Sequence, residues 1–103
     1  MIVAFSVNGV SIRLTEERLD HIQRNHPKIW DKDKILETIS NPDLVQKGDM
    51  GSLLAIKKFA KTPVKEDKYL VVVYKEITNF DGFVLTAYYT SYLKDRIILW
   101  KKN

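Results

Sequence analysis

Residues 13–27 read Arg13-Leu-Thr-Glu-Glu-Arg-Leu-Asp-His-Ile-Gln-Arg-Asn-His-Pro27, and this stretch contains both histidines of the chain. Thr15 is a residue type that caps helix N-termini, and the two glutamates that follow it lie where the positive end of the helix dipole favours them. Pro27 disfavours the helical conformation at the residue before it. The stretch therefore predicts a helix that begins after Thr15 and ends at about His26.

The helical spacing places the two histidines in different surroundings. His26 shares a face with the apolar residues Leu19 and Ile22, whereas His21 shares a different face with Arg18. Histidine is the side chain whose ordinary pKa lies near neutral pH. Two histidines on one short helix therefore make proton transfer a candidate function of this part of the chain.

Composition and charge limit the classes of protein to consider. The chain has 103 residues, of which 45% are hydrophobic and 29% are charged, as in ordinary globular proteins, and we expect a single domain spanning residues 1–103. No apolar run approaches the roughly 20 residues that cross a bilayer, so we expect no membrane association. The absence of cysteine excludes disulfides and thiolate nucleophiles. We expect a cytoplasmic protein.

The net charge of +4 favours a polyanionic partner such as RNA, although many small proteins carry such a charge for solubility alone.

The remaining chain predicts an α+β fold, with an N-terminal strand or hairpin and two helices packed on a four-stranded antiparallel sheet. Asn8-Gly9 is the sequence signal of a type I′ hairpin turn. A second helix is expected from Asp31 or Asp33 to Ser40, before Asn41-Pro42. The expected strands span residues 43–47, 52–60, 68–77 and 83–90, a Gly-containing loop spans 79–82, and 95–101 forms an edge strand or a tail.

Strand alternation predicts one apolar and one polar face of the sheet. The predicted core face of the last long strand carries Phe83, Leu85, Ala87 and Tyr89, and its other face carries Val84, Thr86, Tyr88 and Thr90. Lys57 and Lys58 point to opposite sides of their strand, so one of them joins the polar face. Lysine, threonine and tyrosine together suit contacts with phosphate.

Five features in this order resemble the BECR superfamily, which comprises barnase, EndoU, colicin E5/D and RelE-like nucleases. They are Leu14-Thr-x-Glu-Arg18, His21-Ile22, His26-Pro27, Ile-Ser-Asn-Pro-Asp at 39–43, and a Val-rich strand followed by Thr86-Ala87-Tyr88. The chain is most similar to the small phage- and toxin-associated branch, and the similarity spans about residues 14–88.

The resemblance implies metal-independent RNA cleavage without a cofactor, often by a toxin that is paired with an antitoxin or immunity protein. Carried onto this sequence, it gives His21, His26, Thr86 and Tyr88 as catalytic residues. Charge and position add Lys58, Lys75 and Arg18 as substrate-binding residues. RNA supplies its own nucleophile, the 2′-OH, so cleavage needs a base, an acid and hydrogen-bond donors or a cation for the phosphate. The expected product is a 2′,3′-cyclic phosphate.

Each of these residues also has a purely structural interpretation. A histidine on a charged helix is often solvated, and His26 suits a helix C-terminus because its positive form interacts well with the dipole. Thr86 and Tyr88 are favoured in any strand, and lysines usually face solvent. The alternative function is a non-catalytic module of the same fold that binds RNA or protein. The apolar run 97–100 offers a docking segment for a partner.

Overall fold

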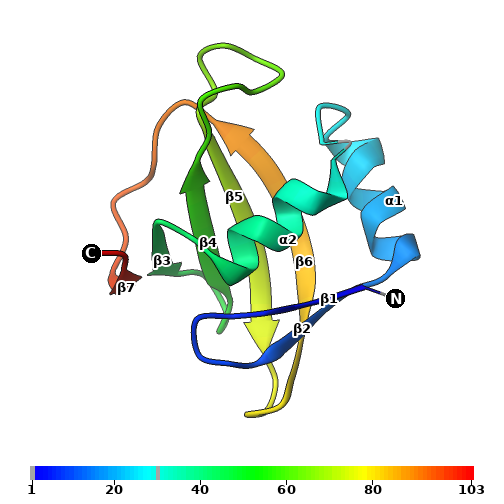
Figure 1. The fold of residues 1–103 in the computed structure, drawn as a ribbon, viewed down its shortest axis with the longest axis vertical. Helices are drawn as coiled ribbons and strands as arrows, with labels where there is room; N and C mark the ends of the chain where they lie inside the picture. The colour runs from blue at the N-terminus through cyan, green and yellow to red at the C-terminus, as the bar shows by residue number, and fades with distance from the viewer. Residues whose placement is uncertain (1, 30) are drawn as a thin grey trace.

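In the part of the chain that the structure describes, residues 2–29 and 31–103, the computed structural model contains two helices and one seven-stranded sheet (Figure 1). The elements in chain order are β1 (Ile2–Phe5), β2 (Ser11–Leu14), α1 (Glu16–Asn25), α2 (Lys32–Ser40), β3 (Leu44–Lys47), β4 (Leu53–Lys58), β5 (Tyr69–Glu76), β6 (Asp81–Thr90) and β7 (Ile98–Lys101). The strand order across the sheet is β1-β2-β6-β5-β4-β3-β7.

The predicted α+β class, the N-terminal hairpin and both helices are confirmed. Strands β3, β4, β5 and β6 are the four predicted strands, and each pairs antiparallel with the next. The prediction of a four-stranded, wholly antiparallel sheet is wrong in detail. The hairpin extends the sheet at one end, because β2 pairs parallel with the start of β6, and β7 extends it at the other end by pairing with β3.

Local sequence signals explain the two helices. The Thr15 side chain accepts a hydrogen bond from the backbone N–H of Arg18 at 3.0 Å, which satisfies a free donor of the first turn of α1. The Asp31 side chain does the same for the N–H of Asp33 at the start of α2. At the other end of α1, His26 leaves the helical conformation before Pro27, with φ −133°.

The predicted type I′ turn at Asn8-Gly9 is wrong. Gly9 adopts a φ of +77°, but Asn8 is not among the described residues with positive φ, which a type I′ turn requires at both central positions. The Gly9 N–H donates to the Ser6 carbonyl at 2.8 Å, and the Ser6 N–H donates to the Val10 carbonyl. The loop is thus a type I turn followed by a left-handed glycine.

A turn of the I′ kind joins β3 to β4 instead. Its central residues Met50 and Gly51 have φ values of +54° and +80°, and the Ser52 N–H donates to the Asp49 carbonyl at 3.0 Å. Methionine is unusual at a left-handed position because its Cβ approaches the neighbouring backbone.

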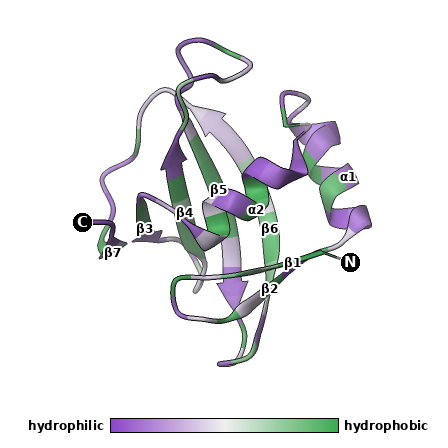
Figure 2. Ribbon diagram, in the orientation of Figure 1, coloured by the Kyte–Doolittle hydropathy of each residue, from purple (hydrophilic) through white to green (hydrophobic). Residues whose placement is uncertain are grey.

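Both helices pack on one face of the sheet, which we call the covered face. Figure 1 shows α2 lying across this face and α1 beside β6, and α2 contacts β1, β4 and β5 while α1 contacts β6. Figure 2 shows hydrophobic colouring along β4 and β5 and alternating hydrophobic and hydrophilic bands on the helices. The fully buried large side chains of this core are Ile12, Leu14, Ile22, Ile35, Ile39, Leu70, Val72, Tyr74 and Val84.

The opposite face of the sheet, which we call the open face, has a much smaller apolar cluster. Its buried members are Leu54, Ile56 and Val71, and the partly buried residues packed against them include Tyr88 and Leu93. No helix of the described residues lies over this face, so the strand residues outside this buried cluster are available for contacts with other molecules.

A β-bulge corrects the predicted faces of β6. The register of β5 and β6 shifts so that Val73 lies opposite Thr86 while Tyr74 lies opposite Val84. The extra residue in β6 turns Val84 to the covered face, where it is buried with Ala87. The prediction that Val84 shares a face with the hydroxyl residues is therefore wrong, whereas Thr86 still shares the open face with Tyr88.

Gly82 lies within β6 and not in the predicted loop at 79–82. It stands opposite Ile12 of β2 and opposite Glu76 of β5, where the hairpin joins the rest of the sheet. A Cβ atom built at Gly82 would come within 2.2 Å of the Lys75 carbonyl oxygen and 2.7 Å of Ile12 Cδ1. The close approach of three strands therefore requires glycine here.

Candidate functional site

The candidate site lies where α1 meets the second half of β6. β2 pairs only with the first three residues of β6, so beyond Phe83 this strand has β5 on one side and α1 on the other. Arg18 of α1 reaches this edge, and its Nη1 donates to the Leu85 carbonyl at 3.3 Å. The interaction satisfies a backbone acceptor next to the bulge and holds the helix against the strand.

His26 lies at the end of this helix and beside the strand. Its backbone N–H donates to the Ile22 carbonyl at 2.7 Å, and its carbonyl accepts from the Ile29 N–H at 2.9 Å. The half-buried His26 ring lies 6.1 Å from the Tyr88 ring, centroid to centroid, with the planes tilted by 38°. Because the backbone around His26 is fixed on both sides, the imidazole is held at this edge.

Tyr88 connects this edge to the open face. It lies opposite Val71 in the sheet and packs against the apolar cluster of the open face, while its ring also meets His26. Thr86 precedes it by two residues and therefore points to the same face. The structure thus brings three of the four predicted catalytic residues, His26, Tyr88 and Thr86, to one edge of the open face.

His21 is exposed on α1 and does not contact this group. Its Nε2 lies 3.0 Å from the side-chain Nδ2 of Asn25, one helical turn later. Helical spacing places His21 on the same flank of α1 as Arg18, which reaches the strand.

The predicted lysines lie on the open face but at different distances from Tyr88. Lys58 is opposite Tyr69, which is opposite Thr90, so two strand spacings separate Lys58 from β6. Lys75 follows Val73 by two residues and shares its face. Lys58 and Lys75 therefore lie at the margin of the group formed by His26, Tyr88 and Thr86.

Lys57, the other lysine of β4, has structural contacts. Its Nζ donates to the Asn41 carbonyl at 2.9 Å and lies 3.8 Å from a carboxylate oxygen of Glu37. Glu37 and Asn41 lie at the end of α2, which packs on the covered face, so Lys57 points to the covered face. Lys58 is therefore the lysine that points to the open face.

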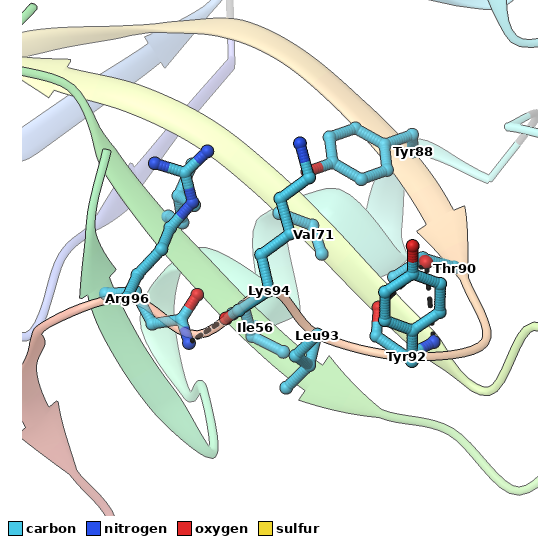
Figure 3. A pocket seen from close by; sticks show the side chains of 10 residues that line it. Ile56, Val71, Tyr88, Thr90, Tyr92, Leu93, Lys94 and Arg96 are labelled. Carbon is cyan, nitrogen blue, oxygen red and sulfur yellow. Dashed lines mark hydrogen bonds between the residues drawn. The ribbon is translucent and has the colours of Figure 1, made fainter. Parts of the chain in front are cut away.

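The segment 91–97, which we call the tail, adds residues that the sequence analysis did not assign to the site. After β6 it crosses the open face toward β7 and forms one wall of a pocket of about 100 Å³ (Figure 3). Lys94 and Tyr88 both line this pocket, and Figure 3 shows their polar ends directed toward one another. A lysine four residues after the end of a predicted strand has no local signal that would assign it to the sheet face.

A second hollow lies on the other side of His26. It is lined by Asn25, His26, Asp67 and Tyr89, and burial raises the pKa of the Tyr89 phenol, with Asp31 as a smaller cause. Tyr89 points to the covered face with Ala87, so its phenol is a packing group of the helix side. His26 therefore lies between two tyrosines: Tyr89, which packs on the covered face, and Tyr88, which points to the open face.

Among residues 2–29 and 31–103, no group of three or more histidine, cysteine, aspartate or glutamate side chains is arranged to hold a metal ion. Neither helix of these residues is long and apolar enough to cross a membrane.

Comparisons with protein-family models, with curated proteins and with solved structures found no match for this chain. The resemblance to the BECR superfamily therefore rests on the sequence features alone, and its functional content is a proposal.

Proposed function

We propose that this protein is a metal-independent endoribonuclease of the toxin type. The observation that supports this function best is the contact between His26 and Tyr88, at an edge of the open face that also carries Thr86 and Lys94. A group that transfers protons thus lies beside hydroxyl donors and a cation, which is the combination that RNA cleavage by the 2′-OH requires.

In this mechanism His26 acts as the base. It removes the proton from the 2′-OH, the 2′-oxygen forms a bond to phosphorus, and the bond from phosphorus to the 5′-oxygen breaks. The products are a 2′,3′-cyclic phosphate and a 5′-hydroxyl, which receives a proton from an acid. Positioned proton transfer of this kind contributes about 10²–10⁴-fold to a rate.

The phosphate gains negative charge during the reaction, and the open face supplies groups that stabilise it. Tyr88 and Thr86 donate hydrogen bonds through their hydroxyls, and Lys94 provides a positive charge. Removing one such donor costs about 10²–10³-fold in well-studied hydrolases. The proton for the leaving 5′-oxygen comes from Tyr88 or from His21, and the variants below separate these two assignments.

The substrate of this proposal is single-stranded RNA laid along the open face. Arg18 uses Nη1 for the Leu85 carbonyl, and its guanidinium makes no other hydrogen bond among the described residues, so its other N–H groups can bind a phosphate at the α1 edge. Lys75 and Lys58 extend the positive charge across the sheet. Binding should therefore weaken with increasing salt, because phosphate contacts release counterions.

A cleavage assay with matched variants tests the proposal. Wild type, His26→Ala, His21→Ala and Tyr88→Phe are incubated with total RNA in EDTA, and the 3′ ends of the fragments are characterised. We expect cleavage to cyclic phosphate by the wild type and a loss of about 10²-fold or more in His26→Ala. A loss in His21→Ala as large as that in His26→Ala assigns the acid to His21, whereas an unchanged rate in His21→Ala leaves Tyr88 as the acid.

A folded wild-type protein that leaves tRNA and mRNA intact, beside a ribonuclease control that cuts them, would refute this function. An unchanged rate in His26→Ala at equal protein concentration would refute the assignment of the base.

The alternative is a non-catalytic module that binds RNA or protein. The observation that favours it is the position of His21, which is exposed and hydrogen-bonded to Asn25 and so leaves one histidine at the sheet edge. RNA binding that falls with salt, without any cleavage, would establish the RNA version.

The protein version of the alternative depends on β7. This edge strand has four exposed residues, Ile98 to Lys101, and Lys102 follows it, so we propose an acidic partner that adds a strand, such as an antitoxin or immunity protein. The charge disfavours a second copy of this chain. We therefore expect a monomer in sedimentation experiments, and a dimer that is lost when the residues after Arg96 are deleted would assign the β7 edge to self-association.

A further inference from the structure

The tail is fixed above the open face by contacts along its length. Leu93 packs against the apolar cluster of that face. The Thr90 hydroxyl donates to the Tyr92 carbonyl at 2.9 Å, and the buried Gln46 of β3 donates through Nε2 to the Lys94 carbonyl at 3.2 Å. The tail is therefore a defined wall of the pocket, held to both β6 and β3.

The far end of the tail is anchored by a second set of contacts. Arg96 Nη1 lies 3.2 Å from a carboxylate oxygen of Asp49 in the β3–β4 turn. The Lys47 N–H donates to the Ile97 carbonyl at 2.8 Å, immediately before β7 begins. These contacts keep the tail from closing onto the sheet, and a pocket of about 100 Å³ remains beneath it.

The pocket has an apolar floor and polar walls. Leu54, Ile56 and Val71 form the floor, and the walls are Gln46, Tyr88, Thr90, Tyr92, Leu93, Lys94 and Arg96. Figure 3 shows Tyr88 and Tyr92 on the β6 side of this group and Lys94 and Arg96 along the tail. Two aromatic rings over an apolar floor suit a flat ring that stacks, and the polar groups suit a ring with hydrogen-bonding edges.

The charge at the pocket favours a neutral ring over a second phosphate. The guanidinium of Arg96 is paired with Asp49, so its charge is compensated within the protein. Gln46 uses its Nε2 for the tail, and no donor among the described residues contacts its Oε1, which is therefore an acceptor for a ligand. This carboxamide oxygen only accepts hydrogen bonds, so it can bind the N–H group of a nucleobase but offers no donor to an anion.

We propose that this pocket is a nucleobase subsite, in which the base of an RNA nucleotide stacks on Tyr92 and meets Gln46 and the tail with its polar edge. Tyr88 lines the pocket and also contacts His26, so a base in the pocket would place its own phosphate at the Tyr88 hydroxyl and Lys94. This placement of the phosphate rests on the proposed function. The subsite adds to that function a pocket that selects the base of the nucleotide next to the cleaved bond.

The test uses 2′-deoxynucleoside 3′-monophosphates, which lack the 2′-OH and are not cleaved by this mechanism. Amide and side-chain NMR shifts of the ¹⁵N- and ¹³C-labelled protein are followed during titration with each of the four nucleotides. Deoxyribose phosphate without a base is the control for simple anion binding. We expect the nucleotides to shift resonances of Val71, Tyr88 and Tyr92 and the sugar phosphate to leave Val71 unchanged.

Three variants sharpen this test. Tyr92→Ala removes the stacking ring, and we expect about 5- to 150-fold weaker nucleotide binding, the range that follows from aromatic stacking of one base. Tyr92→Phe keeps the ring and should bind like the wild type. Phe80→Ala removes an exposed aromatic ring outside the pocket and should also bind like the wild type.

Two results would overturn the subsite: equal shifts with the base-free sugar phosphate, or Tyr92→Ala binding as tightly as the wild type. The result of the nucleotide-binding test can be distinguished from the result of the RNA cleavage assay. Cleavage of RNA without nucleotide binding in this pocket would keep the ribonuclease and remove the subsite, while nucleotide binding in a protein that never cuts RNA would keep the subsite and remove the ribonuclease.

Discussion

On the covered face of the sheet, Val72 and Tyr74 of β5 are fully buried under the helices, whereas on the open face their neighbours Val73 and Lys75 are only half-buried. The same strand therefore supplies a close-packed core on one side and, apart from the buried Val71, a partly accessible surface on the other. The difference shows how a small domain divides its strands: residues of the covered face hold the fold, and the open face has side chains available for chemistry.

The largest effect on stability should follow from a deletion of core atoms on the covered face. Ile39 of α2 is fully buried, and Ile39→Ala should lower the free energy of unfolding by about 2–5 kcal/mol through lost burial and a cavity. The matched open-face variant Val73→Ala should cost less, because Val73 is only partly buried. Urea denaturation of both variants makes the comparison, and equal losses would contradict the division between the faces.

Gly82→Ala tests the join between the hairpin and the rest of the sheet. The added Cβ would meet the Lys75 carbonyl oxygen and the Ile12 side chain, so strands must move apart. We expect a loss of about 1–3 kcal/mol in the free energy of unfolding, the usual cost of overpacking. The measurement is the urea midpoint, with the m-value as a check on two-state behaviour. Unchanged stability would show that the three strands are less closely packed than the structure has them.

Tyr74→Phe removes a hydroxyl from the covered face. The Tyr74 hydroxyl is buried without a hydrogen-bond partner among the described residues, so its removal should leave stability unchanged or raise it, by up to about 1–3 kcal/mol. Thermal unfolding at pH 7 measures this effect. A clear loss of stability would show that the hydroxyl has a partner, such as a bound water.

The same variant has a predicted pH dependence. Burial, with a smaller contribution from Glu76, raises the pKa of Tyr74 above its ordinary value of 10.0. The folded protein then keeps a proton that the unfolded chain releases, so this contribution to stability is complete below about pH 10 and falls as the pH rises further. As the pH rises above 10, the Tyr74→Phe variant should lose less stability than the wild type. The matched control is Tyr92→Phe, at an exposed tyrosine, which should behave like the wild type.

The smallest effect is expected at the β3–β4 turn, which belongs to neither face. Met50 is 91% exposed and has a φ of +54°, which suits glycine or asparagine better than methionine. Met50→Gly should raise the free energy of unfolding by about 0.5–1 kcal/mol, and differential scanning calorimetry can detect the shift. Activity on RNA should not change, so a change would link the turn to the open face through Asp49 and Arg96.

Local sequence signals predicted the elements of this fold well. Thr15 caps α1 and Pro27 follows its end as predicted, and the β-rich segment 69–76 is a central strand. These features depend on the conformational preferences of a few adjacent residues. Thr86 and Tyr88 were also placed correctly on one face, because they lie on the same side of the bulge.

Long-range packing determines what the sequence did not reveal. The parallel pairing of β2 with β6 joins residues such as Arg13 and Asp81, whose ion pair spans 68 positions in the chain. The bulge that turns Val84 to the covered face arises from the fit between β5 and β6 and has no glycine or proline to mark it. Lys94 reaches the open face because Gln46 and Leu93 hold the tail there.

The most direct test of the division between the faces compares two substitutions that each remove one tyrosine hydroxyl, Tyr88→Phe on the open face and Tyr74→Phe on the covered face. RNA cleavage in EDTA and the free energy of unfolding are measured on both proteins and on the wild type. We predict that Tyr88→Phe loses about 10²-fold in cleavage rate with unchanged stability, and that Tyr74→Phe cleaves RNA like the wild type. Equal cleavage by Tyr88→Phe and the wild type, or a loss of cleavage in a stable Tyr74→Phe, would contradict the account.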